Sequence, residues 1–325
     1  MLMVNDTSTV NEIHPCYVSH NVTYTFTHIP SLKCVILYIF LGSLSVVTVC
    51  GNALVIISII YFKQLHVPTN YLILSLAVAD LLVGVLVFPF SMAFTVTSCW
   101  YHEDLACKLR EVFDVILSTA SILNLCCISI DRYYAVCHPL AYKSKINNCI
   151  IGVMILVSWG VAALTGICIV YVGRVDGKCE ESCLLDALIS NTLSCIFAFY
   201  IPVIVMLHIY LRIFFAAQKQ AKQIQNTKSG ANVSKMEKKA TKTLAIVVGV
   251  FLLCWTPYFL CIIFQPLIHE ITPISVIEAF NWLALSNSTL NPFIYAFFYS
   301  WFRSAFRTII SGKIFNEDFS NTKLL

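Results

Sequence analysis

The stretch VFDVILSTASILNLCCISIDRYY at residues 112–134 decides the fold, because charged residues lie near its ends and none lies in its middle. The uncharged interval from Asp114 to Asp131 approaches the roughly 20 residues with which an α-helix crosses a bilayer. Arg132 follows Asp114 by eighteen positions. That separation is five helical turns, or roughly 27 Å. The stretch therefore predicts a membrane-spanning helix with Asp114 near one surface and Arg132 near the other, on one face.

The composition of the whole chain points the same way. Of its 325 residues, 58% are hydrophobic and 12% are charged, whereas an ordinary globular domain has about 25% charged residues. Six more stretches are long enough to span, and only Asp80 places a charge in any of them. These stretches are 34–62, 69–96, 146–173, 187–211, 243–269 and 279–302. They are too long and too evenly apolar for β-barrel strands, which alternate over about ten residues.

We therefore predict an all-α fold, a seven-transmembrane helix bundle that occupies residues 33–298. Residues 1–32 are expected to form an extracellular N-terminal tail. Residues 299–325 are expected to form a short amphipathic eighth helix and a cytoplasmic tail.

Basic residues predict the orientation of the bundle. Most of the 21 Lys and Arg residues face the cytoplasm if the N-terminus is outside, as the positive-inside rule requires. The net charge of +4 is then a property of inner loops near membrane lipid, and no nucleic-acid partner is expected. Residues 1–9 lack the pattern of a signal peptide, so the first helix should direct insertion. We predict a multi-pass plasma-membrane protein with glycans on the outer sequons at Asn5 and Asn21.

Cysteine usage differs between the two sides of the membrane. The outer segments are exposed to an oxidising environment, where disulfides form. They contain six of the 15 cysteines: Cys16, Cys34, Cys99, Cys107, Cys179 and Cys183. Spacing alone leaves their pairing open. No second pair accompanies Cys179 and Cys183 as a zinc site would need. We expect no metal site, and we find no nucleophile with a base that would indicate an enzyme.

Asp114 is a functional hypothesis, because ionisable side chains inside a membrane are costly and rare. Val115 and Ser118 lie close to it on the same helix, and no Lys or Arg lies in a neighbouring span. A ligand cation would supply the opposite charge. Aromatic faces that attract ammonium groups are available, namely Trp255, Tyr258, Phe259 and Trp282. The alternative is a structural carboxyl group that a hydroxyl stabilises, and the residues alone do not separate the two.

Asp80 is the second acid at membrane depth. Polar residues from other spans could surround it, namely Asn52, Ser121, Asn287, Ser288 and Asn291. Oxygen ligands at this density suit a small hard cation such as Na⁺, and a purely structural hydrogen-bond network is the competing interpretation. No other cofactor is expected.

Four prolines interrupt predicted spans: Pro89, Pro202, Pro257 and Pro292. Each removes a backbone hydrogen bond and favours a kink. The last two lie beside Trp255 and Asn291, where a helix could pivot.

These motifs, in this order, resemble those of rhodopsin-like G-protein-coupled receptors over nearly the whole chain. They are Gly51-Asn52, Leu76-Ala77-Val78-Ala79-Asp80, Asp131-Arg132-Tyr133, Trp159, Pro202 with Tyr210, Cys254-Trp255-Thr256-Pro257 and Asn291-Pro292-Phe293-Ile294-Tyr295. The resemblance implies a heterotrimeric G protein as partner. It also assigns roles in activation and coupling to Asp131, Arg132, Tyr133, Tyr210, Trp255, Pro257, Pro292 and Tyr295.

Within that family the chain resembles the amine receptors, and most closely the trace amine-associated receptors. Asp114 stands where amine receptors place the aspartate that binds ammonium, and residues 287–292 match the subgroup's seventh-helix pattern. The resemblance implies a small-molecule amine ligand and a stimulatory G protein that raises cyclic AMP. It also implies a role in olfactory sensory neurons and the disulfides Cys107–Cys183 and Cys16–Cys179.

Some positions depart from that pattern. Leu285 stands where amine receptors commonly have a tyrosine. Of the serines with which catechol receptors bind their ligand, Ser194 remains, but Cys195 and Ala198 replace its neighbours, so a catecholamine is not expected. A diamine or polyamine would need a second acid, for which Glu278 is the foremost choice. The alternatives are a neuromodulator receptor outside olfaction and, more remotely, a helical transporter or channel, although no paired repeat supports the latter.

Overall fold

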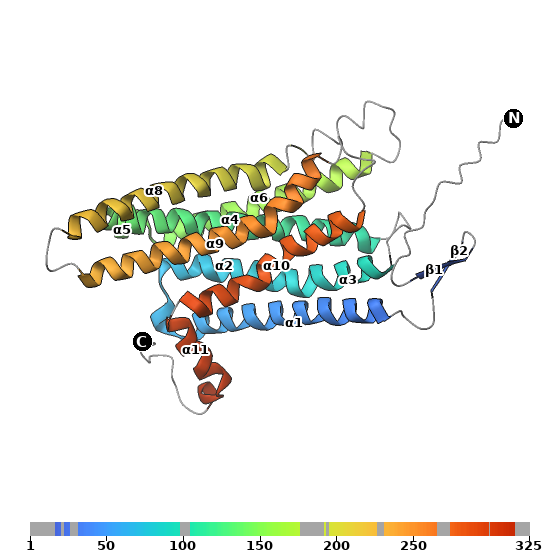
Figure 1. Cartoon of the computed structure of the whole chain (residues 1–325), viewed down its shortest axis with the longest axis horizontal. Coiled ribbons are helices and arrows are strands. Elements are labelled where there is room, and N and C mark those ends of the chain that lie inside the picture. Colours follow the sequence, from blue (N-terminus) through green and yellow to red (C-terminus); the bar gives the residue numbers. More distant parts are fainter. Residues whose placement is uncertain are drawn as a thin grey trace.

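Long helices lying side by side form the body of the computed structural model (Figure 1). The structure describes residues 17–20, 23–26, 32–97, 105–175, 192, 195–225, 231–264, 274–298 and 300–315. The spanning helices are α1 (Leu32–Tyr61), α4 (Leu105–Cys137), α6 (Asn148–Val175), α8 (Ile201–Gln225), α9 (Ala231–Phe264) and α10 (Ile274–Phe298). One more span is continuous through α2 (Pro68–Leu82), η2 (Val83–Val87) and the start of α3 (Phe88–Thr97). The predicted helical bundle is therefore confirmed.

The spans close into a ring that includes α4, and α6 packs against α4 from outside it. Helix α1 lies beside α2 and α10, α9 lies between α8 and α10, and α4 packs against α2, α6 and α8. Among the described residues, six helical segments are long and apolar enough to cross a membrane, and α10 is not one of them. The polar residues Asn281, Asn287 and Asn291 lower the apolar character of α10. The seventh span is thus distinguished by the absence of charge in its inner part more than by its hydropathy.

Short helical elements connect and end the spans at the end of the bundle that holds α5 (Figure 1). They are η1 (Lys63–Leu65), α5 (Pro139–Lys145), α11 (Ser300–Ile310) and η5 (Lys313–Phe315). Helix α11 buries Phe302 and Ala305 and exposes Arg303 and Arg307, which is the amphipathic pattern expected of an eighth helix. Arg303 also donates hydrogen bonds to the carbonyls of Ala296 and Phe297 (3.0 and 2.9 Å), so it binds the last turn of α10.

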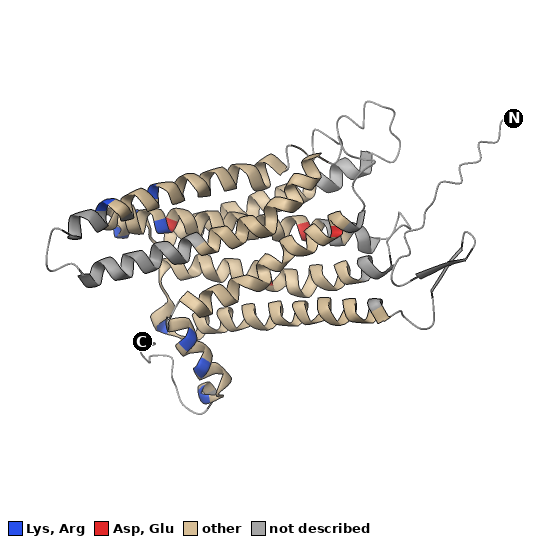
Figure 2. Ribbon diagram, in the orientation of Figure 1, with Lys and Arg blue, Asp and Glu red and all other residues tan. Residues whose placement is uncertain are grey.

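Charges are separated along the bundle (Figure 2). The described Lys and Arg gather at the end that holds α5 and α11. Large apolar side chains such as Ile39 and Leu156 point away from the bundle and are 68% and 73% exposed. Such an exposed apolar belt is what contact with lipid requires.

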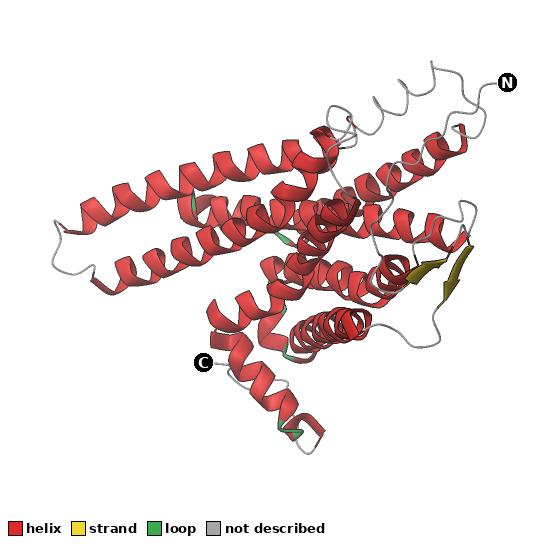
Figure 3. Ribbon diagram, turned by 45° about the vertical axis from the view of Figure 1, so that its right-hand side comes forward, coloured by secondary structure: helices red, strands yellow, loops and turns green. Residues whose placement is uncertain are grey.

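Among the described residues, a small β-hairpin departs from the all-α prediction. Strand β1 (Tyr17–His20) pairs antiparallel with β2 (Thr23–Phe26), with Tyr17 opposite Phe26 and His20 opposite Thr23. Figure 3 shows the hairpin set apart from the helices at the opposite end from α11. Its alternating β-branched and aromatic residues favour extended structure.

Two of the predicted prolines follow π-helical turns. Segment η2 (Val83–Val87) precedes Pro89, and η4 (Ile196–Tyr200) precedes Pro202. A wider turn accommodates the backbone bond that proline cannot make. Pro257 and Pro292 lie within α9 and α10 instead.

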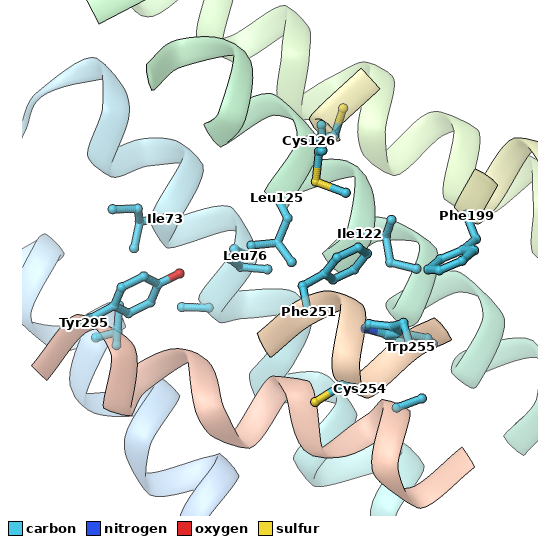
Figure 4. Close-up of a cluster of buried hydrophobic side chains, with 14 of the residues drawn as sticks. Ile73, Leu76, Ile122, Leu125, Cys126, Phe199, Phe251, Cys254, Trp255 and Tyr295 are labelled. Atoms are coloured by element: carbon cyan, nitrogen blue, oxygen red, sulfur yellow. The ribbon is translucent and has the colours of Figure 1, made fainter. Parts of the chain in front are cut away.

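A buried apolar cluster packs the spans together in the middle of the bundle (Figure 4). Its members come from α1, α2, α4, η4, α8, α9, α10 and α11, and include Ile73, Leu76, Ile122, Leu125, Phe199, Phe251, Trp255 and Tyr295. Ile122, Trp255 and Phe259 belong to this cluster and also line the cavity described in the next subsection.

Gly166 on α6 allows the closest helix approach. A β-carbon there would lie 2.4 Å from Ile116 Cγ1 on α4. We expect Gly166→Ala to lower the unfolding free energy by about 1–3 kcal/mol through overpacking, measured as a lower Tm of the purified protein in detergent. Gly160→Ala on the same helix is the matched control, since nothing lies within 4 Å of its added carbon. A Tm unchanged by Gly166→Ala would contradict this packing.

Candidate functional site

A cavity of about 140 Å³ lies between α4, α6, η4, α9 and α10. Asp114 is half-buried and is the single charged side chain among the described residues that line it. Ser118, one turn along α4, donates a hydrogen bond from Oγ to Asp114 Oδ1 (3.0 Å). The other lining residues are Val115, Thr119, Ile122, Thr165, Cys195, Ala198, Trp255, Tyr258, Phe259, Ile262 and Asn281. The cavity thus combines one carboxylate with mostly apolar walls.

Aromatic rings form the α9 side of the cavity. Trp255 and Phe259 are almost fully buried, and their ring centroids are 5.7 Å apart. Phe259 stacks on Phe199 at 4.1 Å, and Tyr258 meets Phe259 edge-on at 5.6 Å. The negative face of such rings attracts a cation. A cation near Asp114 would therefore meet a carboxylate on one side and aromatic walls on another.

Two predicted ligand residues, Trp282 and Glu278, are not among those that line the cavity. Trp282 packs on Phe88 with ring centroids 5.4 Å apart, in a cluster that also buries Leu285. Glu278 is half-buried on α10 but does not line the described cavity. Ser194 lies outside the described residues. The aromatic cage at Asp114 therefore has three of its four predicted members.

Sequence reasoning missed Asn281, Thr165 and Ile262, which line the cavity. Asn281 stands four residues before Leu285 and three after Glu278, so helical spacing puts all three near one face of α10. That spacing could have identified Asn281. Thr165 and Ile262 carry no comparable signal, because single polar or apolar residues are common in spans.

The polar network at Asp80 joins three spans. Ser121 and Ser288 donate to Asp80 Oδ1 (2.9 and 2.8 Å), and Asn291 donates to Oδ2 (2.7 Å). Asn52 reaches the network indirectly, because its amide nitrogen donates to the Ser288 carbonyl (3.0 Å). Asn287 is buried, and its amide nitrogen has no hydrogen-bond partner within the described residues. Three of the five expected residues therefore contact the carboxylate.

The donor set of this network fits a small hard cation. The Asp80 carboxylate and the hydroxyls of Ser121 and Ser288 are oxygen ligands of the type that such ions prefer. Asn52 Oδ1 is also buried, with no donor in the part of the chain that the structure describes. A sodium ion held here would draw these oxygens toward one centre.

The opposite end of α4 carries an ionic network. Arg132 donates from Nε to Asp131 Oδ2 (2.8 Å) and from Nη2 to Thr69 Oγ1 (2.7 Å). Tyr142 of α5 donates to Asp131 Oδ1 (2.8 Å). Burial, above all, raises the pKa of Tyr142, so its hydroxyl keeps the proton that it donates. Thr69 and Tyr142 were not predicted, and they help to tie Arg132 to the fully buried Asp131.

Three further predicted activation residues, Tyr210, Tyr133 and Tyr295, also make contacts with neighbouring segments. Tyr210 on α8 hydrogen-bonds Ser129 (3.0 Å), and Tyr133 lies 3.3 Å from His138 Nε2. Tyr295 is buried against Phe302. Each side chain therefore links α4, α8 or α10 to a neighbour.

Several predictions fall outside the described residues. They concern glycans at Asn5 and Asn21 and the disulfides Cys107–Cys183 and Cys16–Cys179. The helix α4 includes Cys107, but its side chain is not among those described.

Comparison with known proteins gives one consistent result. Residues 51–295 match the family model "7 transmembrane receptor (rhodopsin family)". Trace amine-associated receptor 4 of Mus musculus is 43% identical over 332 residues, covering 96% of each chain. Trace amine-associated receptor 1 of Homo sapiens is 43% identical over 89% of this chain and 91% of its own. Trace amine-associated receptor 13c of Danio rerio is 42% identical over 92% of both.

Proposed function

Because the chain belongs to the trace amine-associated receptors of the rhodopsin family, we propose that it binds the ammonium group of a small amine at Asp114. Membership makes it an amine receptor with a G-protein partner and not an enzyme. It is also a multi-pass membrane protein. The finer assignments below are our proposals.

The observation that carries the ligand assignment is the chemistry of the cavity wall. A single carboxylate, Asp114, faces a space bounded by Trp255, Tyr258 and Phe259. A half-buried carboxylate opposite aromatic faces favours a cation over an anion or a neutral ligand. Ser118 would hold the carboxylate in position while the ammonium group approaches.

The ligand should be small. The cavity of about 140 Å³ is well below the roughly 300–1,000 Å³ of sites that hold drug-sized molecules. Cys195 and Ala198 supply little hydrogen-bonding capacity on the η4 side, which disfavours a catechol. Leu285 is buried in an apolar cluster and supplies no hydroxyl, so the ammonium group depends the more on Asp114 itself.

A diamine is the second candidate. Glu278 precedes Asn281 by three residues on α10, and Asn281 lines the cavity. A chain of several carbons with an ammonium group at each end would bring its second charge toward Glu278. A larger gain in potency for the diamine than for a monoamine of equal length supports this candidate.

We propose that amine binding shifts the population toward an active arrangement. Helix α9 would pivot near Pro257, two residues after Trp255, and Asp131 would release Arg132 toward the G protein. The wild-type network holds Arg132 against Asp131 and Thr69, which suits the resting form. A stimulatory G protein that raises cyclic AMP is the proposed partner, and olfactory sensory neurons the proposed site. Signalling by an internal neuromodulator is the alternative.

The same proposal covers the topology and the outer covalent features. The N-terminus would be extracellular, with residues 1–32 as tail, 33–298 as bundle and 299–325 as eighth helix and cytoplasmic tail. Disulfides would join Cys107 to Cys183 and Cys16 to Cys179, and glycans would attach at Asn5 and Asn21. Sodium would bind beside Asp80 as an allosteric ion.

The function is tested by cyclic AMP in cells that express the receptor, against a panel of mono-, di- and polyamines. A concentration-dependent rise that mock-transfected cells lack supports the proposal. Neutral alcohols of matched carbon skeleton should give no response. If alcohols and amines act equally, the charge at Asp114 does not select the ligand.

Asp131→Asn should raise ligand-independent signalling about tenfold. Weakening hydrogen bonds to a charged group removes roughly 1.5–3 kcal/mol of restraint from Arg132, and 1.4 kcal/mol is a factor of ten in population. Basal cyclic AMP at matched surface expression is the measurement. Tyr142→Phe removes one donor to Asp131 and should give a smaller rise in the same direction. Unchanged basal signalling in both variants would mean that this network does not hold the resting form.

A further inference from the structure

A second cavity, of about 550 Å³, opens at the end of the bundle that holds α5. It is larger than the cavity at Asp114 and lies at the far end of the spans. Three segments form its wall: the residues that lead into α2, the helix α5 and the turn into α6. The lining residues are His66, Val67, Pro68, Thr69, Tyr142, Lys143, Ile146, Asn147 and Asn148.

The charge of this wall is positive. Lys143 is exposed at the rim, and no acid is among the described residues of the lining. The acid nearest in the bonding network, Asp131, is fully buried and bound to Arg132. The cavity therefore favours an anion.

Donors other than Lys143 are present as well. Asn147 accepts from the Ile150 backbone through Oδ1 (3.0 Å), so its amide NH₂ group is left to donate elsewhere. Asn148 adds a second exposed amide. Helix α2 begins at Pro68 without a side-chain cap, and α6 begins at Asn148, so both helices direct their positive ends toward this region. These groups together suit the several oxygens of a phosphate.

The depth of the cavity bears on the source of such an anion. The spans of α2 and α6 begin at Pro68 and Asn148, and both residues line the cavity. The cavity thus lies where spans leave the hydrocarbon, at the level of lipid headgroups. Next along α6, Ile150, Val153 and Leu156 are exposed by 41%, 52% and 73%, an apolar surface along which acyl chains could run.

We propose that this cavity binds a phosphate-bearing polyanion, with Lys143 as the principal cationic contact. The phosphorylated inositol headgroup of an inner-leaflet lipid and a free inositol phosphate share this chemistry. The inner-leaflet position rests on the proposed orientation of the receptor, whereas binding of the anion does not depend on the amine ligand. The bound phosphate would lie beside Thr69 and Tyr142, the two hydroxyls that contact Asp131.

The test uses the purified full-length receptor in phosphatidylcholine nanodiscs. One arm titrates soluble inositol 1,4,5-trisphosphate. The other adds phosphatidylinositol 4,5-bisphosphate or phosphatidylserine to the disc and counts bound lipids by native mass spectrometry. Binding in the first arm identifies a site for free phosphates as well, whereas binding of the phosphoinositide alone identifies a lipid site that needs the acyl chains.

Lys143→Gln should weaken binding about five-fold, since a basic residue near such a headgroup contributes roughly 1 kcal/mol. Lys145→Gln is the matched control, because it removes the same charge two residues away from a side chain that does not line the cavity. Asn148→Glu places a repelling charge at the rim and should weaken binding further, and thermal unfolding verifies that each variant is folded. Equal losses from Lys143→Gln and Lys145→Gln, equal binding of phosphatidylserine, or no binding in either arm would overturn the proposal.

Discussion

Asp114→Ala should raise the amine concentration for half-maximal cyclic AMP by roughly two to three orders of magnitude. A buried ammonium that loses its carboxylate partner costs ~3–5 kcal/mol, and each 1.4 kcal/mol is a factor of ten in affinity. Asp114 is the single charged residue in the described lining, so no other described wall residue offers a replacement charge. The maximal response should survive, because the G-protein end of α4 is unchanged.

The control for this prediction tests whether the Asp114→Ala receptor still folds and still couples to the G protein. Surface expression, and signalling from an added Asp131→Asn substitution, should match those of the receptor with Asp114 intact. Glu278→Gln should leave a monoamine unaffected and weaken only a diamine. If Asp114→Ala keeps full potency while Glu278→Gln loses it, the ammonium group binds at Glu278 and the proposed site is wrong.

The fold followed from charge more than from hydropathy. Seven uncharged or nearly uncharged runs predicted seven spans, and α10 illustrates why that reasoning held. Its amides lower its hydropathy, yet residues 279–302 contain no charged residue to exclude them from a membrane. The β1–β2 hairpin was missed, although His20 and Thr23 flank a two-residue connection typical of hairpins.

The sequence predicted which residues of one helix lie close together better than it predicted which face of each helix points into the cavity. Val115 and Ser118 follow from their spacing to Asp114 on one helix. Trp282 does not line the cavity, because packing against Phe88 sets the rotation of α10 about its axis. Neighbouring helices determine that rotation, so one helix's sequence does not contain it. Tyr142 escaped prediction for a similar reason, since its contact with Asp131 joins α5 to α4.

Ala198→Phe should reduce amine potency by roughly 100-fold or more, with the carboxylate intact. Ala198 is nearly buried and lines a cavity of only about 140 Å³, so an added ring competes with the ligand for the same space. Overpacking of a filled space typically costs 1–3 kcal/mol or more, and about 2.8 kcal/mol is 100-fold. Radioligand displacement or cyclic AMP, at matched surface expression, measures the change.

Two further variants separate occlusion from misfolding. Ile204→Phe places the same ring on α8 where the side chain is 64% exposed, and it should leave potency unchanged. Ile262→Ala enlarges the cavity from the α9 side, so a bulkier amine should gain potency relative to a small one. These opposite shifts follow only if the ligand occupies this cavity. If Ala198→Phe and Ile262→Ala both leave the ranking of amines unchanged, the ligand lies closer to the mouth of the bundle, and Asp114 acts on it from a distance.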